Sequence, residues 1–259
     1  MKKKSIDGGK AFDWGLTSRQ YARYRDIYPP QLYERLRALG VAADGTSWLD
    51  LGTGTGILPQ NLYNPKAEII GVDISEEQIA YAGRKAAENG WGIRYLIAPA
   101  ERTGFPDNRF DCITAAQCFG YFDREVMKAE IKRLLKPQGV FIKVYMDWCT
   151  DDEIGGASIR LVKKYNKKWN SGSGFADIYD DLFDGRVTES LYCDIPFTRE
   201  SWHGRMCACR GTLASMSKVQ FEKWSEAHKE LLKAYPERFT VKHKLYITCF
   251  TIEKGEHDE

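Results

Sequence analysis

Trp48-Leu-Asp-Leu-Gly-Thr-Gly-Thr-Gly-Ile-Leu58 is the stretch that decides the fold of this 259-residue chain. An apolar run leads into three alternating glycines and then into a segment with helical propensity, as where a buried parallel strand passes into a helix. Glycine reaches positive φ and has no Cβ, so a nucleotide-like ligand can lie against the main chain. The dinucleotide fingerprint G-x-G-x-x-G would need a third glycine where this chain has Ile57. The spacing therefore argues against a dinucleotide.

Two acidic residues accompany the glycine loop. Asp50 precedes it, and Asp73 closes the next apolar run, 67–74. Their separation is close to the roughly 20-residue offset at which a carboxylate at the end of the second strand meets ribose hydroxyls. A ribose-bearing ligand is therefore expected.

The motifs LDLGTGTG and GVDIS resemble motifs I and II of the class I S-adenosylmethionine-dependent methyltransferases. This resemblance implies an α/β fold with a Rossmann-like, doubly wound, seven-stranded and mostly parallel sheet and an α-rich cap insertion. It also implies S-adenosyl-L-methionine as cofactor and S-adenosyl-L-homocysteine as product, with the glycine loop beside the methionine part and Asp73 on both ribose hydroxyls. The cofactor-binding candidates are Tyr21, Arg25, Asp50, Gly52, Thr53, Gly54, Gly56, Asp73, Ile74, Ala100, Glu101 and Gln117.

The chain departs from the family pattern at Pro99, where relatives usually have the aspartate that holds the adenine amino group. Glu101 or backbone groups near Ala100 would have to compensate.

Strands and helices alternate from 46 to 146, which favours a doubly wound parallel sheet, and the alternation stops near 150. We therefore expect four segments: an N-terminal helical lid (1–45), a cofactor-binding core (46–149), a cap or substrate region (150–216), and a C-terminal helix with a closing strand of the core (217–259).

The phrase YARYRDIYP, which contains Tyr21 and Arg25, resembles the helix before motif I in small-molecule methyltransferases of the trans-aconitate type, where it closes over the cofactor. The alternative is a surface helix that packs two tyrosines on the sheet.

Acceptor contacts are expected from two places. The carboxyl end of the fourth strand leads to Phe119 and Tyr121, where open α/β folds place their ligands. In the cap, Arg205 and Arg210 beside Trp202 can clamp a carboxylate against an aromatic wall. That segment resembles the Trp-x-Gly-Arg helix of the trans-aconitate type, and its alternative is a solvated helix face.

The catalytic residues stay open in the sequence. A carboxylate acceptor needs no base, whereas a hydroxyl or amine acceptor does, with His203 and Tyr121 as candidates. His203, Cys207 and Cys209 lack a fourth ligand and the usual spacing, so no metal is expected.

Composition excludes several function classes. Thirty-eight basic and thirty-six acidic residues give a net charge of +2, which predicts no general attraction to nucleic acid or membrane surfaces. Seven cysteines without a C-x-x-C pair suit reduced thiols in a cytoplasmic protein.

The main hypothesis is thus a methyltransferase with a small-molecule acceptor. The alternatives are a non-catalytic S-adenosylmethionine-binding sensor or assembly protein, and a nucleic-acid or protein methyltransferase.

Overall fold

The computed structural model describes residues 7–9, 11, 13, 15–17, 23–24, 28–170 and 181–252. The chain forms two compact units. Unit 1 comprises Met1–Ile27, Met146–Ser173 and Leu191–Leu245, and unit 2 comprises Tyr28–Tyr145, Gly174–Ser190 and Tyr246–Glu259. The expected cap, 150–216, thus contributes to both units, and unit 1 also takes in the first 27 residues.

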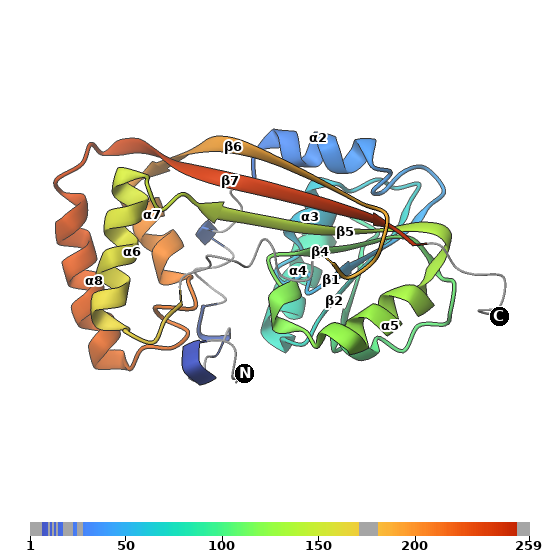
Figure 1. Ribbon diagram of the computed structural model, residues 1–259, viewed down its shortest axis with the longest axis horizontal. Coiled ribbons are helices and arrows are strands. Elements are labelled where there is room, and N and C mark those ends of the chain that lie inside the picture. Colours follow the sequence, from blue (N-terminus) through green and yellow to red (C-terminus); the bar gives the residue numbers. More distant parts are fainter. Residues whose placement is uncertain are drawn as a thin grey trace. The chain divides into compact units, whose positions relative to one another are not determined.

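Seven strands form one sheet in the order β3-β2-β1-β4-β5-β7-β6 (Figure 1). They are β1 (Ser47–Leu51), β2 (Glu68–Asp73), β3 (Arg94–Ile97), β4 (Phe110–Ala116), β5 (Leu135–Trp148), β6 (Arg186–Thr198) and β7 (Arg238–Thr251). The first five strands pair in parallel, and the first strand lies between the second and fourth. This confirms the α/β fold with a mostly parallel seven-stranded sheet.

The last two strands run antiparallel to their neighbours. Phe141 stacks on Phe250, while farther along β5 the Cys149 N–H donates to Lys242 O at 2.8 Å, so β5 and β7 run in opposite directions. The boundary between unit 1 and unit 2 falls within β5 and again within β7.

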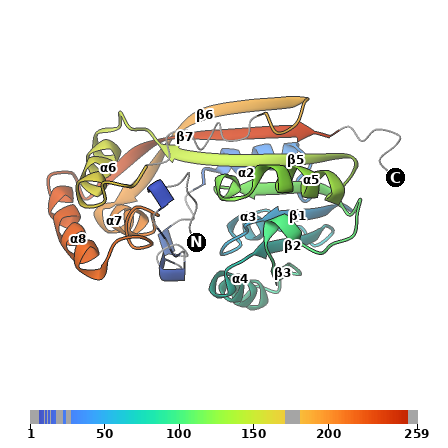
Figure 2. The same cartoon turned by 60° about the horizontal axis from the view of Figure 1, so that its bottom comes forward.

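Helices in unit 2 begin where local chemistry predicts. The Ser75 hydroxyl accepts from the Gln78 N–H and opens α4 (Glu76–Glu88), which packs on β2 and β3 (Figure 2). Asp123 caps α5 (Arg124–Leu134) in the same way. The described part of this unit also contains the α-helices α2 (Pro30–Ala38) and α3 (Ile57–Asn61).

The start of the fifth strand differs from the sequence expectation. The proline and glycine of Lys136-Pro-Gln-Gly139 favour a break between helix and strand, yet β5 pairs with β4 from Leu135 onward, directly after α5. An irregularity in the register absorbs the four residues, with Gln138 at φ +64°. Pairing with β4 therefore extends β5 through a proline and a glycine that would favour a break in the isolated segment.

Unit 1 contains three helices that lie together: α6 (Glu153–Tyr165), α7 (Arg199–Cys207) and α8 (Lys218–Leu232) (Figure 1). Capping boxes at Thr198 and Ser217 open the last two. Their shared core contains the fully buried Trp202 and Trp224. None of the helices in the described ranges combines the length and apolar character that a membrane crossing needs.

Candidate cofactor and acceptor site

The glycine loop between β1 and α3 requires its glycines. Gly52, Gly54 and Gly56 have φ values of +61°, +57° and +80°, which side-chain-bearing residues rarely adopt. A Cβ on Gly52 would lie 2.8 Å from Cβ and Sγ of Cys118, and one on Gly56 would collide with the Tyr95 hydroxyl. Glycine is therefore required at these three positions by the positive φ values. At Gly52 and Gly56 it is also required because neighbouring side chains leave no room for a Cβ.

Asp73 joins this loop to the end of β2. Its two carboxylate oxygens each accept one backbone N–H at 2.9 Å, Oδ2 from Gly54 and Oδ1 from Ser75. Burial raises the pKa of Asp73, and hydrogen bonds from the backbone of Ser75, Gly54 and Ile74 oppose that rise. A carboxylate has about four lone-pair sites, so the hydrogen bonds from the backbone do not exhaust its capacity to accept from a vicinal diol.

Asp50 lies beneath the loop. Its carboxylate accepts from the Thr114 hydroxyl at 2.6 Å, and Thr114 in turn accepts from the Trp48 indole N–H at 2.8 Å. Burial raises the pKa of Asp50 to about 7, against the effect of the Thr114 hydrogen bond. The role of Asp50 as a cofactor ligand stays a prediction.

Two threonines of the loop bear on whether it fits a nucleoside-bearing cofactor. Thr55 has a buried hydroxyl with no hydrogen-bond partner among the described residues. Thr53 is buried beside it and its N–H donates to Val72 O at 2.9 Å, which ties the loop to the neighbouring strand. Positive-φ glycines, an unused hydroxyl and the Asp73 carboxylate together fit such a ligand.

Ile74 and the segment 99–102 follow the carboxyl ends of β2 and β3. Ile74 is 66% exposed directly after Asp73 and offers an apolar surface. Pro99 precedes the short 3-10 helix Ala100–Arg102, and Glu101 accepts from the Asp123 N–H at 3.2 Å. Glu101 therefore also holds the start of α5.

The segment after β4 mixes surface and core positions. Gln117 adopts φ +61° and its N–H donates to Val144 O. Phe119 is fully buried against Phe141 in the core of unit 2, whereas Tyr121 is partly exposed. An acceptor role remains a prediction for both aromatic residues, and only Tyr121 presents surface.

The expected acceptor clamp lies inside unit 1. The Trp202 indole N–H donates to the Ser158 hydroxyl at 2.9 Å. Arg205 is 3% exposed, lies 4.7 Å over the Trp148 ring and donates to Cys209 Sγ at 3.2 Å. Arg210 is 5% exposed and pairs with Asp7 at 2.8 Å. Each side chain therefore has partners within the protein.

His203 is part of a chain of buried rings. Its Nδ1 lies 2.9 Å from Nδ1 of His228, whose Nε2 lies 3.0 Å from the Ser158 hydroxyl. Nε2 of His203 is 3.1 Å from the Ser225 hydroxyl. Burial lowers the pKa of His203 to about 4 and that of His228 to about 3. His203 is thus neutral and a weak base near pH 7.

Two predicted cofactor residues, Tyr21 and Arg25, lie outside the described residues. Among the described residues, no group of three or more His, Cys, Asp or Glu side chains is arranged to hold a metal ion.

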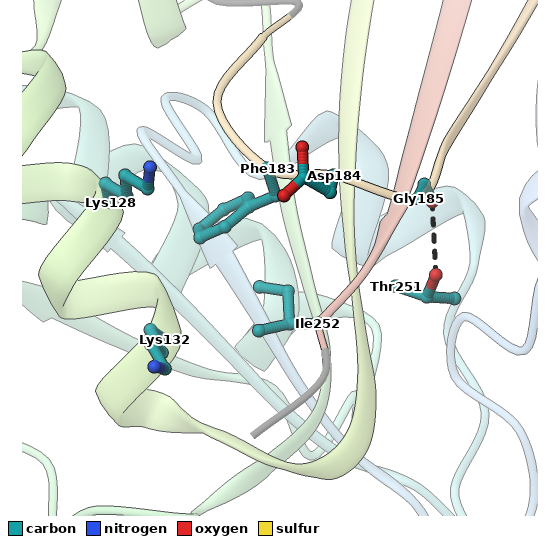
Figure 3. Close-up of a pocket in the computed structure, with 7 residues that line it drawn as sticks. All are labelled: Lys128, Lys132, Phe183, Asp184, Gly185, Thr251 and Ile252. Atoms are coloured by element: carbon teal, nitrogen blue, oxygen red, sulfur yellow. Dashed lines mark hydrogen bonds between the residues drawn. The ribbon is translucent and has the colours of Figure 1, made fainter. Parts of the chain in front are cut away.

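Figure 3 shows a pocket of about 410 Å³ in unit 2, between α5 and the end of β7. Its lining residues are Lys128, Lys132, Phe183, Asp184, Gly185, Thr251 and Ile252. The Thr251 hydroxyl donates to Gly185 O at 3.1 Å across it. It contains none of the residues predicted from the sequence.

Sequence reasoning missed several supporting side chains. Cys118, after β4, and Tyr95, in β3, pack against the glycine loop, and Ser158 and His228 support the aromatic core of unit 1. None of them belongs to a local motif, so only the fold brings them into contact.

Residues 49–143 match the family described as Methyltransferase domain. A demethylmenaquinone methyltransferase of Thermus thermophilus is 43% identical over 94 residues, which is 35% of this chain and 43% of that protein. A ubiquinone/menaquinone biosynthesis C-methyltransferase of Hahella chejuensis is 34% identical over 108 residues, covering 39% and 42% of the two chains. Both matches span less than half of the relative.

Longer matches are weaker in identity. An uncharacterized methyltransferase of Schizosaccharomyces pombe is 25% identical over 235 residues, 86% of each chain. The structure of a proposed type II methyltransferase from Anaeromyxobacter dehalogenans matches with a TM-score of 0.64 at 24% identity, over 88% of this chain and 98% of that one, which shows a shared fold. Residues 49–143 therefore match a methyltransferase domain, and the shared fold extends over most of the chain.

Proposed function

We propose that the chain transfers a methyl group from S-adenosylmethionine to a small-molecule acceptor. The observation that carries the proposal is the joint geometry of the loop and Asp73: Gly54 donates to Oδ2 of Asp73 at 2.9 Å while the loop glycines hold positive φ. This hydrogen bond joins the main chain of the loop to the carboxylate that we propose binds the ribose diol.

When bound, the cofactor supplies an electrophilic methyl group on a sulfonium. Asp73 would hold the ribose and Ile74 would offer apolar surface to the base, while the loop lets the ligand lie against the main chain. Tyr21, Arg25, Ala100 and Gln117 remain further cofactor-binding proposals. The protein's contribution is orientation and exclusion of water, which can lower the barrier by up to ~7–11 kcal/mol in well-aligned cases.

The acceptor is proposed as a small molecule, and two variants of the proposal differ in its chemistry. A carboxylate would have to compete with Asp7 for Arg210, since both oxygens of Asp7 lie within 3.2 Å of that guanidinium. A quinone-type ring follows the names of the Thermus and Hahella relatives, whose matches lie in the cofactor domain. A carboxylate acceptor that binds Arg210 therefore requires the Arg210–Asp7 contact to open. A quinone-type acceptor does not require this change.

The base candidates differ in what the structure supports. His203 has hydrogen-bond partners at both ring nitrogens and a pKa lowered to about 4 by burial, so it would remove a proton poorly at neutral pH. Tyr121 is partly exposed after β4. Of the two, Tyr121 is the better supported proposal.

Turnover with methyl-labelled S-adenosylmethionine tests the function. The purified chain would be incubated separately with demethylated quinols, small carboxylic acids, nucleic acid and protein, and labelled product would be identified by mass spectrometry. We expect label in a small molecule and S-adenosylhomocysteine in equal amount. Cofactor binding without label in any arm would favour a sensor or assembly protein, and label in nucleic acid or protein would reject the small-molecule acceptor.

A further inference from the structure

We propose that Tyr95, in β3, is a positioning residue for the glycine loop, and that its support of Gly56 strengthens cofactor binding. Tyr95 lies outside the motifs that mark the loop and Asp73 in the sequence. Every residue involved belongs to unit 2. The part that concerns the cofactor rests on the proposed function.

The sheet register brings Tyr95 next to a glycine. Gly71 of β2 pairs with Tyr95 on one side and with Asp50 of β1 on the other. Paired residues of neighbouring strands project from the same face of a sheet, and Gly71 has no side chain to place there. A Cβ on Gly71 would lie 2.8 Å from Cδ1 of Tyr95 and 2.7 Å from Oγ1 of Thr53. The Tyr95 ring and the Thr53 side chain therefore take the space that a side chain at position 71 would occupy.

The far end of the Tyr95 side chain reaches the last glycine of the loop. A Cβ on Gly56 would collide with the Tyr95 hydroxyl and would lie 2.7 Å from Nε2 of Gln60. Gly56 is the N-cap residue of α3, with φ +80° and ψ +24°. Gln60 lies in that helix, and its amide donates to Thr55 O at 2.8 Å. Tyr95 and Gln60 therefore both contact the point at which the loop passes into α3.

The contact between Tyr95 and the loop is one of packing. The Tyr95 hydroxyl is buried and has no partner that meets hydrogen-bond geometry among the described residues. A buried hydroxyl without a partner costs free energy of folding. The ring is thus the part of Tyr95 that supports the loop, and a phenylalanine in its place would keep that support.

A glycine-rich loop gains from such support. Gly52, Gly54 and Gly56 all have positive φ, and glycine loses more conformational freedom than any other residue when its backbone is fixed. The Gly54 N–H that donates to Asp73 lies two residues before Gly56, so motion at Gly56 also moves this donor. Packing that fixes the loop before the ligand arrives reduces the entropy lost on binding, which increases affinity.

The first test compares two substitutions of Tyr95. Leucine covers Gly71 but is too short to reach Gly56, so Tyr95→Leu should raise the Kd for S-adenosylmethionine about tenfold, measured by titration calorimetry. Tyr95→Phe keeps the ring, so its Kd should stay within about threefold of the wild-type value. In the chain without ligand, amide hydrogen exchange at residues 53–56 should be faster in Tyr95→Leu and unchanged in Tyr95→Phe.

Tyr246→Leu is the matched control. Tyr246 is also a partly buried tyrosine in a strand of unit 2, and it packs against the hydrophobic core of that unit. Its strand, β7, is separated from β1 by β4 and β5. The substitution should lower the melting temperature through lost packing, and it should leave both the Kd and the exchange at residues 53–56 unchanged.

A second substitution disturbs the same contact from β2. Gly71→Ala places a Cβ against the Tyr95 ring and should therefore also raise the Kd. Because both substitutions act on one contact, the double variant with Tyr95→Leu should raise the Kd by less than the product of the two separate effects. Fully multiplied effects would overturn the shared contact. Gly83→Ala is the control for the added methyl group, since a Cβ there would meet no atom within 4 Å.

The outcomes separate support of the loop from binding of the cofactor. Unchanged exchange at residues 53–56 in Tyr95→Leu, or a Kd for Tyr95→Phe as high as that for Tyr95→Leu, would show that the ring does not support the loop. Faster exchange with an unchanged Kd would overturn the role in cofactor binding. If the wild-type chain binds no S-adenosylmethionine, the proposed function and that role fail together, while exchange still decides the support of the loop. If Tyr95→Leu does not fold, Gly71→Ala takes its place in each comparison.

Discussion

Among single residues of the proposed cofactor site, Asp73 allows the sharpest prediction. Asp73→Asn keeps the shape but places an amide donor where one of two backbone N–H groups now donates, and it removes the charge. We expect affinity for S-adenosylmethionine to fall about ten- to a hundredfold, equivalent to ~1.5–3 kcal/mol for a hydrogen bond to a charged group. Titration calorimetry measures this change.

The matched control is Asp44→Asn, because Asp44 pairs with Lys66 at the surface. That variant should bind the cofactor as the wild type does. Equal affinity of Asp73→Asn and wild type would show that the ribose is held elsewhere.

Among single residues, the sequence predicted those that belong to a local motif. The glycine spacing and Asp73 are a local pattern, and the structure brings them within one hydrogen bond. The partner of Arg210 could not be predicted in this way, because Asp7 lies 203 positions away and nothing in either neighbourhood marks the pair. Burial of that ion pair is a property of the fold.

Individual elements were predictable where their ends carry capping chemistry. Ser75, Asp123, Thr198 and Ser217 each precede a helix and accept from its first backbone N–H groups. The start of β5 was not predictable, since strand pairing extends it through a proline and a glycine. Local signals set helix ends, whereas neighbouring strands set strand ends.

The capping box of α7 gives a prediction at the scale of the element. The Thr198 hydroxyl accepts from the Ser201 N–H at 3.0 Å, and the Ser201 hydroxyl accepts from the Thr198 N–H at 2.8 Å. Thr198→Ala should lower the free energy of unfolding by ~1 kcal/mol, measured by urea denaturation. Thr198→Ser retains the hydroxyl and should lose much less. Equal losses in both variants would mean that the methyl group, not the cap, stabilises the helix.

In the molecule as a whole, burial shifts pKa values in opposite directions in the two units. In unit 2, burial raises the pKa of Asp50 to about 7, so the folded chain binds this proton more readily than the unfolded chain. In unit 1, burial lowers the pKa of His203 and His228 to about 4 and 3. Acid therefore favours the folded state through the aspartate and opposes it through the histidines.

The histidine contribution can be isolated with the double variant His203→Gln, His228→Gln. Unfolded histidines bind protons from about pH 6.5 downward, whereas the folded pair stays neutral to about pH 4, so wild-type stability through this pair is present above pH 6.5 and lost as the pH falls. The loss is at most ~1.4 kcal/mol per pH unit for each histidine. Urea unfolding at pH 7, 6 and 5 should therefore show the wild type losing its advantage over the variant, while Asp50 affects both equally. Parallel curves would mean that burial does not keep the pair neutral.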